Sequence, residues 1–202
     1  MTLLSKILLF FPAIVLLLTG GSLIYFAHSP GIFSAVVVLF SLYGLPVFIY
    51  QLHQWIYPIK EGISYLQGKE YSHWWGSHQI QVIYIAIPVL EAVLRLIPGV
   101  FSGWLRLWGA KIGQNIYWTP GLEIADRGLL EIGDRVVIGH RVGIYSHVIK
   151  PRKHNLMLYV KKVKIGNDVF VGAGSHIAPG VIIENGVYMP VDTNLYPNQK
   201  VK

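Results

Sequence analysis

The chain has 202 residues, of which 53% are hydrophobic and 13% charged, and a formal net charge of +7. It contains no cysteine, which excludes disulfides and cysteine–zinc sites and fits a reducing compartment. No basic face with stacking aromatic residues or known nucleic-acid module is apparent, so we expect no nucleic-acid partner. Basic residues beside an anionic cytoplasmic leaflet account for the positive charge.

Residues 1–52 are predicted to form a transmembrane helical hairpin. Lys6 is the sole charged residue before Lys60, and the uncharged runs 7–27 and 31–52 are each long enough for the ~20 residues that span a bilayer. A signal peptide followed by a buried helix is the alternative, but no small-residue cleavage site follows the first run. The turn at residues 28–30 lacks Lys and Arg, whereas the following region is basic. The positive-inside rule therefore places both termini on the cytoplasmic side of the inner membrane.

Residues 53–109 are predicted to be an amphipathic, interfacial helical region. Residues 79–98 are strongly apolar but include Glu91 and Arg95, which favours an interfacial or re-entrant helix over a third full span. That third span stays open as an alternative. The region is rich in tryptophan, including Trp104 and Trp108, and tryptophan favours the headgroup level of a membrane. The segment 101–108 is expected to be a short amphipathic turn.

A six-residue repeat of large apolar residues runs through the rest of the chain, with small residues after most of them. Neither an α-helix nor a plain strand has this period. Short strands joined by tight turns, three strands to a coil, do have it, and we therefore predict a β-solenoid over residues 110–202. The repeat positions are Ile112, Trp118, Ile124, Ile132, Ile138, Ile144, Ile165, Val171, Ile177, Ile183, Met189 and Leu195.

The units "IGDRVVIGHRVGIYSH" and "VKIGNDVFVGAGSHIAPGVIIENGV" resemble the hexapeptide-repeat acyltransferases. The resemblance covers residues 110–198 and implies a left-handed parallel β-helix of about four coils, working as a homotrimer. The preceding helical region is similar to a membrane-anchored branch of that family. The implied activity is transfer of an acetyl or longer acyl group from acyl-CoA, a co-substrate, with no bound cofactor and no metal.

The repeat breaks between Ile144 and Ile165, and the segment from about Lys150 to Lys162 is expected to be a loop outside the solenoid. In the sugar acetyltransferases of the family a similar loop begins at a catalytic histidine. The resemblance implies that His147 is the corresponding residue in this chain. A neutral imidazole can accept the acceptor's proton near neutral pH. His154, inside the same segment, is the alternative base.

Asp126 is the second catalytic candidate, because it lies where the repeat slips by two residues. The resemblance implies that an acidic residue near this place orients the histidine or contacts the acceptor. A simple turn aspartate two residues before Gly128 explains it equally well.

For the donor, the resemblance implies acyl-CoA in a groove between two β-helices. Small residues would admit the pantetheine, a backbone N–H would stabilise the oxyanion, and lysines would meet the phosphates. A solvated basic segment is an equal alternative for the lysines. The candidate residues are Ala173, Gly174, Ser175, Lys161 and Lys162, with Lys164 beside them.

The predicted function is thus a membrane-anchored O- or N-acyltransferase, whose acceptor is a membrane lipid or a membrane-associated molecule such as a lipid-linked sugar, a glycolipid or a hydrophobic metabolite. One alternative is a non-catalytic β-helix scaffold at the membrane. Another is a zinc enzyme resembling the β-helical carbonic anhydrases, which needs three histidines on one metal. The spacing of His147 and His154 does not match the ligand spacing of those enzymes.

Overall fold

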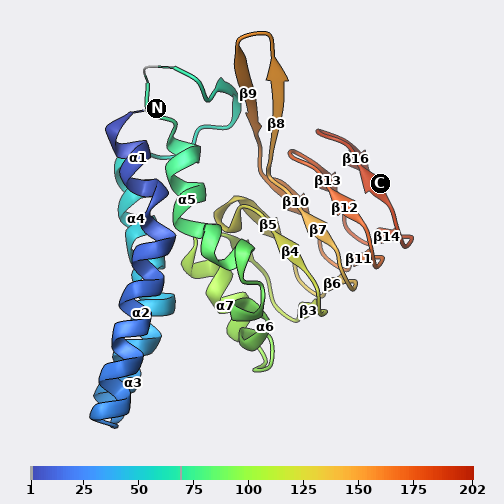
Figure 1. Ribbon diagram of the computed structural model, residues 1–202. Coiled ribbons are helices and arrows are strands. Elements are labelled where there is room, and N and C mark those ends of the chain that lie inside the picture. The colour runs from blue at the N-terminus through green and yellow to red at the C-terminus, as the bar shows by residue number, and fades with distance from the viewer. Residues whose placement is uncertain (1, 69) are drawn as a thin grey trace. The chain divides into compact units, whose positions relative to one another are not determined.

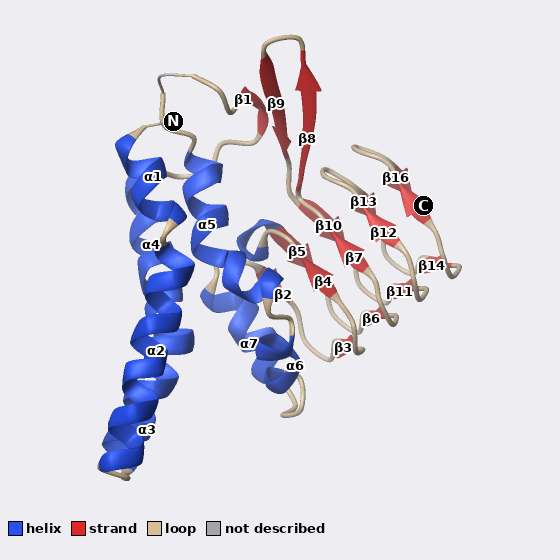
Figure 2. Ribbon diagram, in the orientation of Figure 1, coloured by secondary structure: helices blue, strands red, loops and turns tan. Residues whose placement is uncertain are grey.

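The computed structural model describes residues 2–68 and 70–202 (Figure 1). Tertiary contacts divide the chain into two units: residues up to Ile59 with Gly68–Ile83, and Lys60–Gln67 with Tyr84–Lys202. Helices make up the described part of the first unit, and short strands predominate in the second (Figure 2).

The first unit contains two long helical stretches, Leu3–His28 and Ile32–Ile56, each with a mean hydropathy of 2.4. By length and composition both are able to cross a membrane, as the uncharged runs predicted. Their elements are α1 (Leu3–Leu9), α2 (Phe11–His28), α3 (Ile32–Leu39), a π-helical turn (Phe40–Gly44) and α4 (Leu45–Ile56), followed by the start of α5 (His73–Ala86). Pro12 and Pro46 lie near the start of α2 and of α4, where the turn at Phe10 and the π-helical turn interrupt regular α-helical bonding, as expected where a proline supplies no N–H.

Polar and apolar side chains of this pair are distributed in the reverse of a water-soluble helix pair. Thr19, Ser22 and Ser34 are buried, whereas Leu17 and Ile32 are largely exposed. Each buried serine satisfies its hydroxyl locally: Ser22 Oγ donates to the carbonyl of Thr19 at 2.7 Å, and Ser34 Oγ donates to a carbonyl in the turn between the helices. The outward surface is therefore apolar.

The apolar segment 79–98 is not one continuous helix. Helix α5 ends at Ala86, α6 occupies Val89–Leu94 and α7 occupies Val100–Leu107. Pro88 explains the interruption, because it has no N–H to donate into a continuing helix. Among the described residues, the two stretches of the first unit alone are long and apolar enough to span.

Trp104 and Trp108, expected at a headgroup boundary, are instead buried in the second unit. Their rings pack edge to face against each other and against Tyr84. Helix α7 contacts the first strand of the solenoid, so these aromatic rings belong to the hydrophobic core at the start of the β-helix.

The segment expected to be a loop is a β-hairpin. Strands β8 (His147–Arg152) and β9 (Asn155–Val160) pair antiparallel, and β1 (Gly62–Tyr65) adds to β9 as a third strand. The departure from the solenoid was therefore predicted, but its regular structure was not. Leu158 and Val160 are buried and alternate along β9, a period-two pattern that the missing six-residue repeat concealed.

Thirteen short strands form three parallel sheets (Figure 1). Sheet 1 contains β2 (Lys111–Ile112), β5 (Leu130–Ile132), β10 (Val163–Ile165), β13 (Ile182–Ile183) and β16 (Lys200–Val201). Sheet 2 contains β3 (Tyr117–Trp118), β6 (Val137–Ile138), β11 (Phe170–Val171) and β14 (Tyr188–Met189). Sheet 3 contains β4 (Glu123–Ile124), β7 (Gly143–Ile144), β12 (His176–Ile177) and β15 (Asn194–Leu195). The chain visits the sheets in the order 1, 2, 3, as a parallel β-helix requires.

The repeat residues stack in register along each sheet. In sheet 3, for example, Ile144 pairs with Ile124 on one side and with Ile177 on the other. Eleven of the twelve repeat positions are buried, and Trp118 is partly exposed. The predicted apolar core is therefore observed, and the parallel sheets are consistent with the expected left-handed β-helix.

The turns between strands follow one rule. Ten connections within residues 111–201 have four residues, and the third residue of each has a positive φ. Glycine, asparagine and aspartate tolerate this left-handed conformation best, and Gly174 and Gly180 are examples. Arg135 and Arg141 occupy the same position without that tolerance.

Candidate active site

The coils depart from regularity at one corner, where the chain passes from sheet 3 to sheet 1. The two later coils turn there with four residues, 178–181 and 196–199. The first coil uses residues 125–129, which include a 3-10 turn (Arg127–Leu129), and the second uses residues 145–162, which include the hairpin. Within residues 111–201, these are the two connections that exceed four residues. Because coils stack, the two enlarged connections are neighbours.

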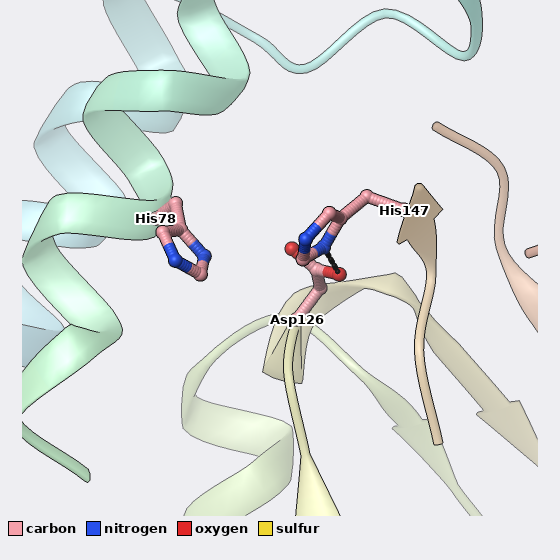
Figure 3. A group of neighbouring side chains, drawn as sticks. All are labelled: His78, Asp126 and His147. Carbon is pink, nitrogen blue, oxygen red and sulfur yellow. Dashed lines mark hydrogen bonds and ion pairs between the residues drawn. The ribbon is translucent and has the colours of Figure 1, made fainter. Parts of the chain in front are cut away.

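Asp126 and His147 meet at this corner (Figure 3). The ring Nδ1 of His147 lies 2.6 Å from Oδ2 of Asp126, a short charge-assisted hydrogen bond. The Asp126 side chain is 2% exposed and that of His147 is 17% exposed. The meeting follows from the stacking, since Asp126 comes two residues after Ile124 and His147 three residues after Ile144, its partner in the ladder.

Backbone contacts hold the two connections together. Ala125 N–H donates to the carbonyl of Ile144 at 3.1 Å, and the buried Ser146 Oγ donates to the carbonyl of Leu129 at 3.0 Å. These bonds join the residues on either side of Asp126 to the residues immediately before His147. Hydrogen bonds between the coils therefore fix the backbone that carries the Asp126 carboxylate and the His147 imidazole.

A buried ion pair supports the turn that carries Asp126. Arg127 donates from Nε and Nη2 to the two carboxylate oxygens of Glu91, at 2.6 and 2.9 Å. Trp104 Nε1 donates to the same carboxylate at 2.9 Å. Arg127 and Glu91 are both almost fully buried. Sequence reasoning missed this network, although a lone carboxylate in the apolar segment 79–98 was a signal for it.

Tyr145 lies between the end of β7 and His147, and its hydroxyl has a polar partner in Glu123. Its hydroxyl donates to Glu123 at 3.1 Å, and its ring stacks on His176. Burial, together with the nearby Glu123 carboxylate, raises the pKa of Tyr145 to about 12. Tyr145 therefore stays neutral and serves as a hydrogen-bond donor at neutral pH.

The residues predicted to bind the donor lie elsewhere. Ala173, Gly174 and Ser175 form the corner between sheets 2 and 3, a different edge of the same β-helix. The buried Ser175 Oγ donates to the carbonyl of Pro190 and accepts from Thr193 N–H, so it joins one coil to the next. Within one chain, these residues and His147 belong to different corners.

The predicted lysines are engaged in contacts of their own. Lys161 Nζ donates to Asn198 at 2.9 Å, and Lys162 Nζ lies 3.4 Å from Glu131. Burial alone would raise the pKa of Glu131, but Lys164, Lys111 and Lys162 together lower it below its usual value. This acidic residue reduces the local positive charge of the lysines.

The other three histidines from residue 111 onward lie on the surface. His154 is exposed in the turn between β8 and β9, and His140 and His176 are also exposed. Across the part of the chain that the structure describes, no three of His140, His147, His154 and His176 converge on one point within metal-binding distance.

Comparison with known proteins was made at the level of family, sequence and structure. Residues 162–189 match the family model described as bacterial transferase hexapeptide (six repeats). A putative acetyltransferase of Saccharomyces cerevisiae is 41% identical over 75 residues, which cover 36% of this chain and 38% of that protein. The putative colanic acid biosynthesis acetyltransferase WcaF of Escherichia coli is 25% identical over 123 residues, 49% of this chain and 68% of that protein.

Among solved structures, the chain is similar to a hexapeptide-repeat acetyltransferase of Vibrio cholerae in complex with acetyl coenzyme A, with 17% identity and a TM-score of 0.45. That match covers 59% of this chain and 80% of that one. The chain spans only 9% of a delta-poly-L-ornithine synthetase of Acinetobacter baumannii, another relative. The match to the hexapeptide family model covers residues 162–189, and stacked parallel coils extend the same kind of repeat over residues 111–201.

Proposed function

We propose that the protein is an acyl-CoA-dependent acyltransferase in which His147 is the general base and Asp126 orients it. The contact of 2.6 Å between His147 Nδ1 and the buried Asp126 carboxylate carries this proposal. A carboxylate accepts hydrogen bonds, so Nδ1 bears the proton of the neutral ring. Nε2 is then the nitrogen with a lone pair, and it is the atom able to take a proton from an acceptor.

In the proposed reaction, the acceptor hydroxyl or amine attacks the carbonyl carbon of the thioester while its proton passes to His147 Nε2. The tetrahedral intermediate then collapses, the carbon–sulfur bond breaks, and the departing coenzyme A thiolate recovers the proton from the imidazolium. Asp126 stabilises the imidazolium that forms between these steps. Its burial strengthens that interaction, because charges interact more strongly where water is excluded.

We place acyl-CoA, carrying an acetyl or longer acyl group, along the flank of the β-helix. Ala173 and Gly174 leave space for the pantetheine, a backbone N–H beside Ser175 stabilises the oxyanion, and Lys161 and Lys162 meet the phosphates. Since Ala173, Gly174 and Ser175 occupy a different corner of one chain from His147, a homotrimer would bring one subunit's donor corner to another's histidine. The names of two relatives, both putative acetyltransferases, support the acyl chemistry.

The acceptor is proposed to be membrane-associated. The helical stretches Leu3–His28 and Ile32–Ile56 expose apolar side chains and bury hydroxyl groups, an arrangement suited to lipid. We propose that they cross the inner membrane with both termini and the β-helix in the cytoplasm. A lipid-linked sugar, a glycolipid or a hydrophobic metabolite fits such an anchor, and the WcaF relative is named for colanic acid biosynthesis.

A hollow of about 500 Å³ beside the catalytic turn suits the apolar part of an acceptor. Its lining includes Ile85 and Val89 on the helical side, and Leu122 and Ile124 on the coil side. Arg127, which follows Asp126 directly, also contributes to the wall. An acceptor bound there would lie close to the turn that carries the proposed orienting carboxylate.

The test uses the full chain in lipid nanodiscs with acetyl-CoA and a membrane lipid extract. Coenzyme A release gives the rate, and mass spectrometry of the lipids identifies the acylated product. His147→Ala should lower turnover by about 100-fold or more, because general-base catalysis commonly contributes ~10²–10⁴. His154→Ala, an exposed histidine of the same hairpin, is the matched control and should retain nearly full activity.

The affinity for coenzyme A should change little in His147→Ala, since the base acts mainly in the transition state. Near-normal transfer by His147→Ala with loss in His154→Ala would identify His154 as the base. If the unmodified chain gives no acylated product, and His147→Ala and His154→Ala still bind the same membrane partners as the unmodified chain, the protein is a non-catalytic scaffold.

A further inference from the structure

A second hollow of about 540 Å³, which shares Arg95 with the hollow beside the Asp126 turn, occurs in the second unit between the α6–α7 connection and the first coil of the β-helix. Its lining includes Arg95, Phe101, Arg106, Gln114 and Trp118. None of its lining residues takes part in the Asp126–His147 contact, and none is a carboxylate. The hollow therefore combines two guanidinium groups, amide groups and aromatic rings without an acidic residue in its wall.

Arg95 is the most informative of these residues. Its guanidinium lies over the ring of Phe101 at 4.9 Å, and its Nη1 atom is buried without a hydrogen-bond partner among the described residues. Burial lowers the pKa of Arg95, although the Glu91 carboxylate opposes this effect. Both Glu91 oxygens are already bonded to Arg127. A guanidinium with a buried, unbonded N–H is costly, and an anion in the hollow would offset part of that cost by pairing with its charge.

Arg106 supplies a second cation in a fixed position. Its Nε donates to the carbonyl of Ile112 at 2.9 Å, and its Nη2 donates to the carbonyl of Gly113 at 2.6 Å. These bonds use the Nε and Nη2 donors and fix the guanidinium in the wall of the hollow. Arginine is the usual residue for binding phosphate oxygens because its planar donors match their geometry.

Exposed apolar side chains lie next in the sequence to the residues that line the hollow, and one of them, Ile97, lines it. Leu96 is 79% exposed and Ile97 61% exposed, and Val100 is exposed at the start of α7. On α6 itself the pattern is reversed relative to a water-soluble helix, because Glu91 points inward while Val89 and Val93 are exposed. Exposed aliphatic residues beside an anion-binding hollow fit a ligand that is charged at one end and hydrocarbon at the other.

We propose that this hollow binds the phosphate headgroup of an anionic membrane phospholipid, with the acyl chains against Leu96, Ile97 and Val100. Arg95 and Arg106 contact the phosphate oxygens, and Gln114 and Trp118 border the remainder of the headgroup. The bound lipid holds the β-helical unit against the membrane surface. This role is independent of the transfer chemistry at His147.

The experiment titrates the full chain in detergent with phosphatidylglycerol and counts bound lipids by native mass spectrometry. Arg95→Gln should weaken phosphatidylglycerol binding by about tenfold or more, the equivalent of one lost charge-assisted hydrogen bond. Arg141→Gln removes the same charge from an exposed corner of the β-helix and should leave binding unchanged. The unfolding temperature of each variant shows whether it is folded.

Two further arms separate a lipid from free phosphate. Leu96→Ser alters only an exposed side chain and should weaken phosphatidylglycerol binding several-fold, and phosphatidylcholine should bind the unmodified chain far more weakly than phosphatidylglycerol. Equal losses in Arg95→Gln and Arg141→Gln would show that binding depends on net charge alone and would overturn the site. Displacement of phosphatidylglycerol by millimolar inorganic phosphate, with no effect of Leu96→Ser, would overturn the lipid assignment.

Discussion

The stacked apolar residues of sheet 3, its ladder residues, adjoin the corner between sheets 3 and 1. The ladder is apolar and regular, whereas the corner is polar and irregular. Ile144 is fully buried and pairs in register with isoleucines above and below it. Three residues later, His147 remains partly exposed and contacts a carboxylate. Regular four-residue turns close the other corners, whereas this corner contains a 3-10 turn in one coil and a hairpin in the next.

This difference shows how a repetitive fold accommodates a site. The buried repeat residues stack in register from coil to coil, and a polar side chain at one of these positions would be buried among apolar neighbours. Additional residues inserted at a corner do not disturb the ladder, and two such insertions in adjacent coils bring side chains from distant parts of the chain together. The corner needs polar support in exchange, and the Glu91–Arg127 pair provides it.

Glu91→Gln should produce the largest change in stability. The substitution removes the charge opposite the buried Arg127, and breaking a buried ion pair commonly costs about 3–5 kcal/mol. Denaturant unfolding followed by tryptophan fluorescence measures the free energy of unfolding. The control is Glu123→Gln, an exposed carboxylate that bonds Tyr145, for which we expect a change below ~1 kcal/mol. Equal small losses in both variants would show that the pair does not support the corner.

Ile144→Ala should lower the free energy of unfolding by about 2–5 kcal/mol, because it leaves a cavity in the sheet 3 ladder. Its turnover per folded molecule should remain close to that of the unmodified chain. His147→Ala is the reciprocal variant, with a large loss of turnover and little change in unfolding. If both variants lose activity and stability together, the division between ladder and corner is wrong.

Asp126→Asn should reduce turnover about tenfold or more while changing stability less than Ile144→Ala. An asparagine keeps the size of the side chain but removes the charge that orients His147 and stabilises its protonated form. The decisive measurement is the rate at saturating acceptor. Should only the acceptor KM rise, Asp126 would belong to acceptor binding and not to the orientation of His147.

Arg141→Asn should have the smallest effect, a stabilisation of up to about 1 kcal/mol. Arg141 has a φ of 55° at the third position of a regular turn, where asparagine is better tolerated. Thermal unfolding provides the measurement, and activity should not change. Destabilisation would indicate that contacts of the Arg141 side chain outweigh its backbone strain.

The sequence by itself determined the β-helix and its register. The six-residue period places Ile112, Ile132 and Ile165 on one ladder, because a period shared by successive coils leaves little choice of pairing. The sequence also identified the two apolar helical stretches, from their uncharged runs, and the two places where the six-residue repeat breaks. These signals are local, since they depend on spacing and side-chain type along a single segment.

The tertiary structure alone decided what the breaks contain. The hairpin at residues 147–160 is completed by β1, some 80–100 residues earlier in the chain, and no local pattern announces that pairing. The partner of Arg127 is Glu91, 36 residues away, and Asp126 meets His147 only because successive coils stack. Contacts between distant segments are set by the assembled coils. For that reason the breaks in the repeat and the family resemblance identified Asp126 and His147 as candidates but did not predict their contact.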